Sequence, residues 1–262
     1  MGEPPKHPEL LDWLAHWFVN DANWSLKKLH RLILTSNTWR MSTRSNPAYA
    51  AADPENRLLW RLPHRRLQVE AIRDSMLAVS GQLNPKMFGP AMKPAIPAAA
   101  VEANTDKESS WKPSDPIEAS RRTIYAYIKR GLVVPMLEVL DLADTVSSCP
   151  QRQVTTVAPQ ALSLFNGDFV NEQARHFASR LQREAGSGRR EQIELAWRLA
   201  LCRPPTTTEI AAMETFCGQE ASKLMAEASA EKRELTKAEA EQAALTQMCR
   251  VILNLNEFVY AE

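Results

Sequence analysis

The chain has 262 residues, a hydrophobic content of 44% and a formal net charge of +1, from 32 basic and 31 acidic residues. This length suits one large or two small domains, and the balanced charge gives no overall field that would attract nucleic acid. No apolar run approaches the ~18 residues of a membrane span. Residues 1–5 lack the basic head and apolar stretch of a signal peptide. We therefore expect no membrane span and no nucleic-acid partner, and the N-terminus by itself indicates a cytoplasmic location.

Cofactor motifs are absent from the sequence. Only eight glycines occur, and neither GxGxxG nor GxxxxGK[ST] is present. The four cysteines form no CxxC or CxxCH pair, and the five histidines show no HExxH spacing. We therefore expect no metal, no haem and no other cofactor. We also expect no disulfide, because Cys202, Cys217 and Cys249 fall in predicted helices while Cys149 lies in a loop far away in sequence.

The N-terminal quarter predicts short amphipathic helices. Pro8 stands at the first position of a helix whose apolar stripe is broad, so we expect an exposed apolar patch where other sequence packs. Ser25 can cap a second helix, and a short element begins at 53–54. A fourth helix is predicted from about 65 to 80, with Gly81 as its left-handed C-cap. The stripe of the first helix consists of Leu10, Leu14, Trp17 and Phe18, with Trp13 on its flank.

The middle of the chain loses helical periodicity. Residues 82–120 contain six prolines, and a loop of this length is usually functional or mobile. Trp111 lies inside this Pro-rich loop, whereas most other tryptophans fall at apolar helical positions, so Trp111 is a candidate exposed anchor for a ligand. The alternation of residues over 121–128 predicts a strand.

The C-terminal part predicts helices again. One follows Pro159, one is capped by Asp168 and one covers about 190–201. Capping boxes at 206–209 and 236–239 begin two long helices that we expect to pack as a hairpin.

These elements predict a mainly α fold with at most a small β element. We expect an irregular multi-helix domain over 1–188, which includes the Pro-rich loop 82–120. A C-terminal helical subdomain is expected over 189–262.

The stretch 148–162 concentrates reactive side chains on irregular backbone. Cys149 is a candidate nucleophile, because Arg152 three residues later would lower the pKa of its thiol. No histidine lies nearby in sequence to act as its base, so an inert thiol is the favoured interpretation. Arg152 is then predicted to be a structural hub that holds the 148–158 backbone through carbonyl or carboxylate contacts. Arg152→Lys should destabilise the fold by roughly 1–3 kcal/mol.

Five arginines are candidates for binding an anion. Guanidinium groups bind carboxylate, sulfate or phosphate through paired hydrogen bonds, which would suit an anionic polysaccharide. The competing interpretation, favoured by the many acidic residues, is internal ion pairing. The arginines are Arg65, Arg66, Arg121, Arg122 and Arg152, and their potential partners are Glu70, Asp74, Glu138, Asp141 and Asp144.

Several segments together resemble one family. They are 7–14 (HPELLDWL), 56–60 (NRLLW) with 65–74, and 149–162, and the ending 253–260 fits as well. This combination resembles the planctomycete domain-of-unknown-function family 1553. The resemblance implies a longer, exported or periplasmic protein, with a planctomycete-type cytochrome c domain and a second domain upstream. It carries over no catalytic residue, because the family has no established reaction. Cys202 departs from the small residue that we expect at its position.

Three functions follow as hypotheses. The leading one is a non-enzymatic binding or interaction module whose partners are the upstream domains and an anionic polysaccharide. An enzyme acting on polysaccharide, with its site at 148–160 beside Arg121, Arg122 and the 82–120 loop, is the first alternative. The second is a docking partner of a c-type cytochrome. A pocket that holds Cys149, Arg152 and a histidine or carboxylate would favour the enzyme.

Overall fold

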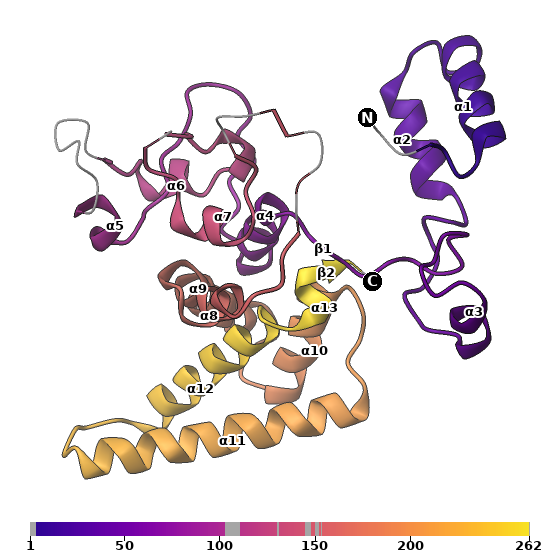
Figure 1. Ribbon diagram of the computed structural model, residues 1–262. Coiled ribbons are helices and arrows are strands. Elements are labelled where there is room, and N and C mark those ends of the chain that lie inside the picture. Colours follow the sequence, from indigo (N-terminus) through magenta and orange to yellow (C-terminus); the bar gives the residue numbers. More distant parts are fainter. Residues whose placement is uncertain are drawn as a thin grey trace. The chain divides into compact units, whose positions relative to one another are not determined.

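The computed structural model describes residues 4–102, 111–129, 131–144, 148–149, 152 and 154–261. Helices joined by loops make up most of it, so the mainly α prediction is confirmed (Figure 1). The chain divides into two compact units. Unit 1 comprises Met1–Arg65 and Ala261–Glu262, and unit 2 comprises Arg66–Tyr260. The predicted boundary between 188 and 189 would subdivide unit 2 and stays a prediction.

Unit 1 contains three helices whose starts follow local capping rules. They are α1 (Pro8–Asn20), α2 (Leu26–Thr35) and α3 (Pro47–Ala52). The Ser25 hydroxyl caps α2 by accepting from the Lys28 amide, and Asn46 caps α3 by accepting from the Ala48 amide at 3.0 Å. The element expected to begin at 53–54 is instead a turn after α3. The Asp53 carboxylate holds this turn through the amides of Arg57 and Leu58, at 2.9 and 2.8 Å.

Unit 1 buries very little. Among residues 4–65 only Ala22 and Thr43 are buried, and no residue of α1 is. Leu10 and Trp13 keep 57% and 51% of their surface exposed, whereas Leu14, Trp17 and Phe18 are half-buried, so the predicted apolar stripe is exposed only in part.

A short strand pair stands at the boundary of the two units, and α4 (Val69–Ser80) is the first helix of unit 2. The helix predicted from 65 starts later, because β1 (Arg65–Arg66) pairs with β2 (Tyr260–Ala261) near the other end of the chain. Gly81 ends α4 with a φ of 78°, the predicted left-handed cap.

The segment after α4 forms short helical turns: α5 (Ala98–Glu102), α6 (Pro116–Ala119), the 3₁₀ turn η1 (Thr123–Tyr125) and α7 (Pro135–Val139). The strand predicted over 121–128 is therefore wrong. Single bridges to Asn84 and Met92 flank η1, and the Asp74 carboxylate accepts from both the amide and the hydroxyl of Thr123, at 2.7 and 2.6 Å. These tertiary contacts from α4 outweigh the local alternation.

The remaining helices enclose the core of unit 2. They are α8 (Ala158–Asn166), α9 (Asp168–Ala185), α10 (Arg189–Leu201), α11 (Thr207–Ala230), α12 (Lys237–Ile252) and α13 (Asn256–Val259). Both predicted capping boxes are present, and α11 and α12 pack side by side as the expected hairpin (Figure 1). The central helix α9 packs against α4, α8, α10 and α12, with Phe177 and Leu181 fully buried. In the described part of the chain, no helix is long and apolar enough to cross a membrane.

Candidate functional site

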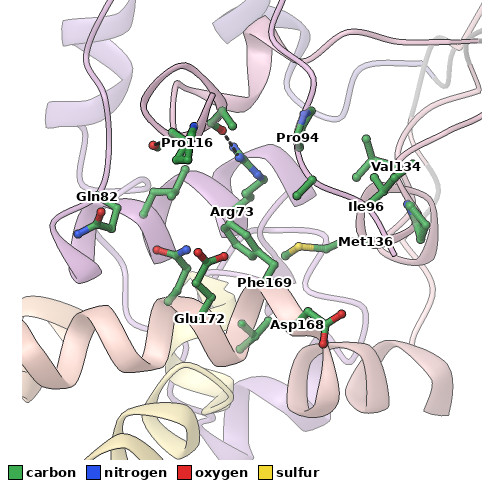
Figure 2. A pocket seen from close by; sticks show the side chains of 18 of the residues that line it. Arg73, Gln82, Pro94, Ile96, Pro116, Val134, Met136, Asp168, Phe169 and Glu172 are labelled. Carbon is green, nitrogen blue, oxygen red and sulfur yellow. Dashed lines mark hydrogen bonds between the residues drawn. The ribbon is translucent and has the colours of Figure 1, made fainter. Parts of the chain in front are cut away.

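A cavity of about 530 Å³ lies inside unit 2, between the start of α9 and three Pro-containing loops. Figure 2 shows Pro94, Ile96, Val134 and Met136 to one side of Arg73 and Gln82 and Pro116 to the other, with Phe169 of α9 close to Arg73. Pro116 belongs to the third loop, beside α4. Most of the lining is apolar, and it comes from segments that are far apart in the sequence.

Arg73 is the basic residue in this lining, and it is only 4% exposed. Its Nη1 donates to the carbonyl of Arg121 and the hydroxyl of Thr123, at 3.2 and 3.1 Å, and its Nη2 donates to the carbonyl of Ala119 at 2.7 Å. The guanidinium carbon lies 5.0 Å from the centre of the Phe169 ring (Figure 2). All of these acceptors are neutral oxygens.

Burial lowers the pKa of Arg73 to about 10, although the neighbouring Asp74 opposes this effect. The side chain therefore remains a cation at neutral pH. The Asp74 carboxylate is itself engaged by Thr123 and lies 3.6 Å from Arg122. The cavity wall thus contains a buried positive charge that donates hydrogen bonds to the uncharged oxygens of Ala119, Arg121 and Thr123.

One face of α9 supplies two carboxylates and an imidazole to the lining. Asp168, Glu172 and His176 are spaced four residues apart and all border the cavity. Glu172 is largely solvated, and its Oε1 lies 3.9 Å from Nε2 of His176. Within the described residues, no group of three or more His, Cys, Asp or Glu side chains could hold a metal ion.

The stretch around Cys149 and Arg152 lies apart from this lining. Cys149 is exposed, and none of the four cysteines, all of which are described, forms a disulfide, as predicted. Arg152 donates from Nη1 and Nη2 to the two carboxylate oxygens of Glu70, at 2.7 and 2.9 Å. Burial by itself would raise the pKa of the Glu70 carboxyl, but the bonds from Arg152 lower it. Of the carbonyl or carboxylate contacts predicted for Arg152, the structure thus shows one with a carboxylate, that of Glu70.

Arg66 forms the centre of a second polar cluster. Its Nη2 donates to the carbonyl of Leu140 at 3.2 Å and to the Asp141 carboxylate at 2.5 Å. Asp141 also accepts from the Thr155 amide at 2.8 Å and from the Gln160 side chain at 3.3 Å. The pKa of Asp141 is lowered, because these bonds outweigh its burial. This cluster fixes the start of α8.

The other arginine candidates serve different purposes. Arg121 is fully buried and donates to the carbonyls of Lys86, Phe88 and Pro90, at 3.3, 2.5 and 3.0 Å, which holds that loop. Arg122 and Arg65 are exposed. The candidate arginines therefore have different partners, and internal ion pairs engage Arg66, Arg121, Arg122 and Arg152, with Arg121 lying 3.4 Å from the Glu118 carboxylate.

The expectation that Trp111 is an exposed anchor is wrong. Its side chain is 6% exposed, and its Nε1 donates to the Pro94 carbonyl at 2.7 Å. The indole thereby buries its ring and satisfies its single donor at the same time. Trp111 is not part of the lining itself, but its hydrogen bond holds Pro94, which is.

Comparison with known protein families gives a match. A family model, PSD1, described as a protein of unknown function (DUF1553), matches residues 1–217. The chain therefore belongs to this family. No curated protein and no solved structure matches it. The DUF1553 match includes the whole described lining of the cavity and ends inside α11, so the similar ending at 253–260 lies outside it.

The sequence does contain a signal for the site of this DUF1553 chain that pattern analysis missed. Arg73 lies between Ile72 and Met76 on the apolar face of α4, and a charge inside an apolar stripe often marks a buried, functional or structural cation. The prolines at 94, 97, 116 and 135 indicated only a loop, because their meeting around one cavity depends on tertiary structure.

Proposed function

We propose that this DUF1553 chain is a binding module that holds a ligand with a largely apolar body in the cavity of unit 2. The observation that carries the proposal is the cavity itself. Its volume of about 530 Å³ falls within the range of about 300–1,000 Å³ that is typical of small-molecule sites. Its apolar walls and few polar groups also match the usual composition of such sites.

The walls of the cavity are held in place without a ligand. Trp111 bonds the Pro94 carbonyl, and the Ser114 amide donates to the Lys93 carbonyl at 2.9 Å while the Lys93 amide donates to the Ser114 hydroxyl at 3.0 Å. The proline rings further restrict the backbone. Because a pre-organised site loses little entropy when it binds, this geometry supports a ligand site.

Binding is better supported than catalysis. Cys149 and Arg152 do not line the cavity, and Arg152 is engaged by Glu70. A pocket that holds both residues was the criterion that would favour an enzyme, and this cavity does not meet it. The candidate arginines for a polysaccharide-cleaving site are also largely paired inside the protein.

The wider context belongs to the same proposal. We place the module in an exported multidomain protein whose upstream domains pack on the exposed apolar side chains of α1. The exposed Arg65 of unit 1 and, separately, the exposed Arg122 of unit 2 would each offer a contact to an anionic polysaccharide. Docking of a c-type cytochrome would use the same α1 surface.

A neutral apolar fluorophore, N-phenyl-1-naphthylamine, tests the cavity. We expect saturable binding by the unaltered protein, and Met136→Trp, which places an indole in the cavity, should weaken it by about tenfold or more. The matched control is Met225→Trp on the exposed surface of α11, which should bind like the parent. Absence of saturable binding by the parent, or equal binding by both variants, would refute the proposal.

A further inference from the structure

We infer that the cavity selects ligands that carry one carboxylate on an apolar body, and that Arg73 binds this carboxylate. The inference rests on the proposed function, because it assumes that the cavity takes a ligand. It adds the chemical class of that ligand and names a residue that determines specificity.

The first reason is the state of Arg73. It is buried and protonated, and it donates hydrogen bonds to two backbone carbonyls and a hydroxyl. A buried cation is usually paired with a carboxylate, since an unpaired buried charge is costly. Among the described residues, no carboxylate oxygen forms an ion pair with Arg73 within the usual distance. The Asp74 carboxylate acts on Arg73 electrostatically but is engaged by Thr123, so a carboxylate on the ligand would supply the direct counter-charge that Arg73 lacks.

The second reason is the surroundings of the guanidinium. Phe169 covers one side of it at 5.0 Å, and the cavity beside it is lined by Pro116 and Leu77. An apolar lining lowers the local dielectric constant, so attraction between opposite charges is several-fold stronger there than in water. A ligand that displaces water from the cavity therefore gains more from a carboxylate than the same ligand would gain at the surface.

Asp168 and Glu172 of α9 would favour a cationic head group on the ligand, but they are more exposed to solvent than Arg73 is. Glu172 keeps 60% of its side chain exposed and can approach His176, whereas Arg73 is almost completely buried. Solvent and salt screen exposed charges strongly and buried charges weakly. Arg73 should therefore dominate the choice of head group, and Asp168 and Glu172 should penalise a second negative charge at the mouth.

Head-group selection can be measured in the unaltered full chain. Decanoate, decanol and decylamine share one apolar body and differ in charge, and each is titrated at neutral pH against bound N-phenyl-1-naphthylamine. We expect decanoate to displace the probe with at least about tenfold higher affinity than decanol, as a charge-assisted bond warrants. Decylamine and methyl decanoate should bind no more tightly than decanol.

The outcomes distinguish the role of Arg73 in head-group selection from ligand binding by the cavity. If decanoate and decanol compete equally, or decylamine competes best, the inference about Arg73 is overturned while the binding cavity stands. If none of the compounds competes and the probe itself does not bind, the proposed function is refuted.

Two variants assign the effect to one side chain. Arg73→Met should abolish the preference for decanoate over decanol, and Arg175→Met, an equal change of charge at an exposed position of α9 outside the cavity, should retain it. A preference that survives in Arg73→Met contradicts the assignment. Because Arg73 also holds the turn at 119–121, the Arg73→Met result counts only if the circular dichroism of this variant matches that of the parent. Otherwise the comparison of decanoate with methyl decanoate in the parent decides the matter.

Discussion

Arg203 joins two helices through two carboxylates. Its Nε and Nη2 donate to Glu257 at 2.5 and 2.7 Å, and its Nη1 and Nη2 donate to Glu209 at 3.0 and 2.6 Å. Glu209 lies in the first turn of α11 and Glu257 lies in α13, so one guanidinium holds both helices. Its bonds lower the pKa of Glu209 to about 2, against the opposing effect of burial.

This lowered pKa predicts acid sensitivity. Because the pKa of Glu209 is lower in the folded state than its ordinary 4.5, its stabilising contribution is complete above that value and is lost as the pH falls toward about 2. The pair is partly exposed, so we expect a loss of roughly 1–2 kcal/mol between about pH 5 and about pH 2.5. Urea unfolding of the parent and of Glu209→Gln measures this, since only the parent should show this component. Equal pH slopes would contradict it.

Cys202 occupies a position that suits glycine. It caps α10 with a φ of 56°, in the left-handed region, which gives a physical reason for the small residue that the family resemblance led us to expect there. Cys202→Gly should raise the free energy of unfolding by roughly 0.5–1 kcal/mol, because glycine adopts this conformation without strain. Cys202→Ala keeps a Cβ atom and should give no comparable gain. Chemical denaturation of the three proteins provides the measurement.

The partial exposure of Arg152 lowers the loss of stability that we expect from Arg152→Lys. The pair with Glu70 has ideal two-bond geometry, but about a third of the Arg152 side chain is exposed. Lysine would keep the charge and lose one of the two bonds, so we expect a cost of roughly 0.5–1 kcal/mol rather than the larger penalty for a fully buried group. Thermal unfolding is the test, and Arg183→Lys at an exposed position provides the control.

At the scale of elements, α1 and α9 represent opposite extremes. No residue of α1 is buried, whereas Phe177 of α9 is completely buried at the centre of unit 2. Phe177→Ala should destabilise the protein by roughly 3–5 kcal/mol, because it leaves a cavity in a packed core. Leu11→Ala in α1 should change stability by less than about 0.5 kcal/mol. Urea unfolding monitored by circular dichroism compares them, and a large effect of Leu11→Ala would mean that the α1 surface is already covered.

Local signals were sufficient for the elements whose ends depend on a few neighbouring residues. The capping boxes at Thr206 and Thr236 and the cap at Gly81 were all predictable, because each involves contacts within one helical turn. The turn at 123–125 was not predictable, since Asp74 and Arg73 determine it from another helix. The candidate cavity escaped prediction for the same reason.

At the scale of the whole molecule, stability is distributed unevenly. Unit 2 contains the buried core formed by α4, α9, α10 and α12, whereas residues 4–65 bury only two side chains. Hydrogen exchange should therefore be fast for the amides of α1 and α2 and slow for those of α9 and α12. Mass spectrometry of peptides from exchanged protein resolves the two groups. Comparable protection of α1 and α9 would contradict this picture.

The pairing of β1 with β2 has a topological consequence. The Leu67 amide donates to the Val259 carbonyl at 2.8 Å, so the chain enters and leaves unit 2 at neighbouring points. A domain whose two ends meet can be inserted into a loop of another protein, or closed into a ring by a short linker, without any change to its interior. The coding sequence of unit 2 could therefore be inserted into another gene as one continuous segment.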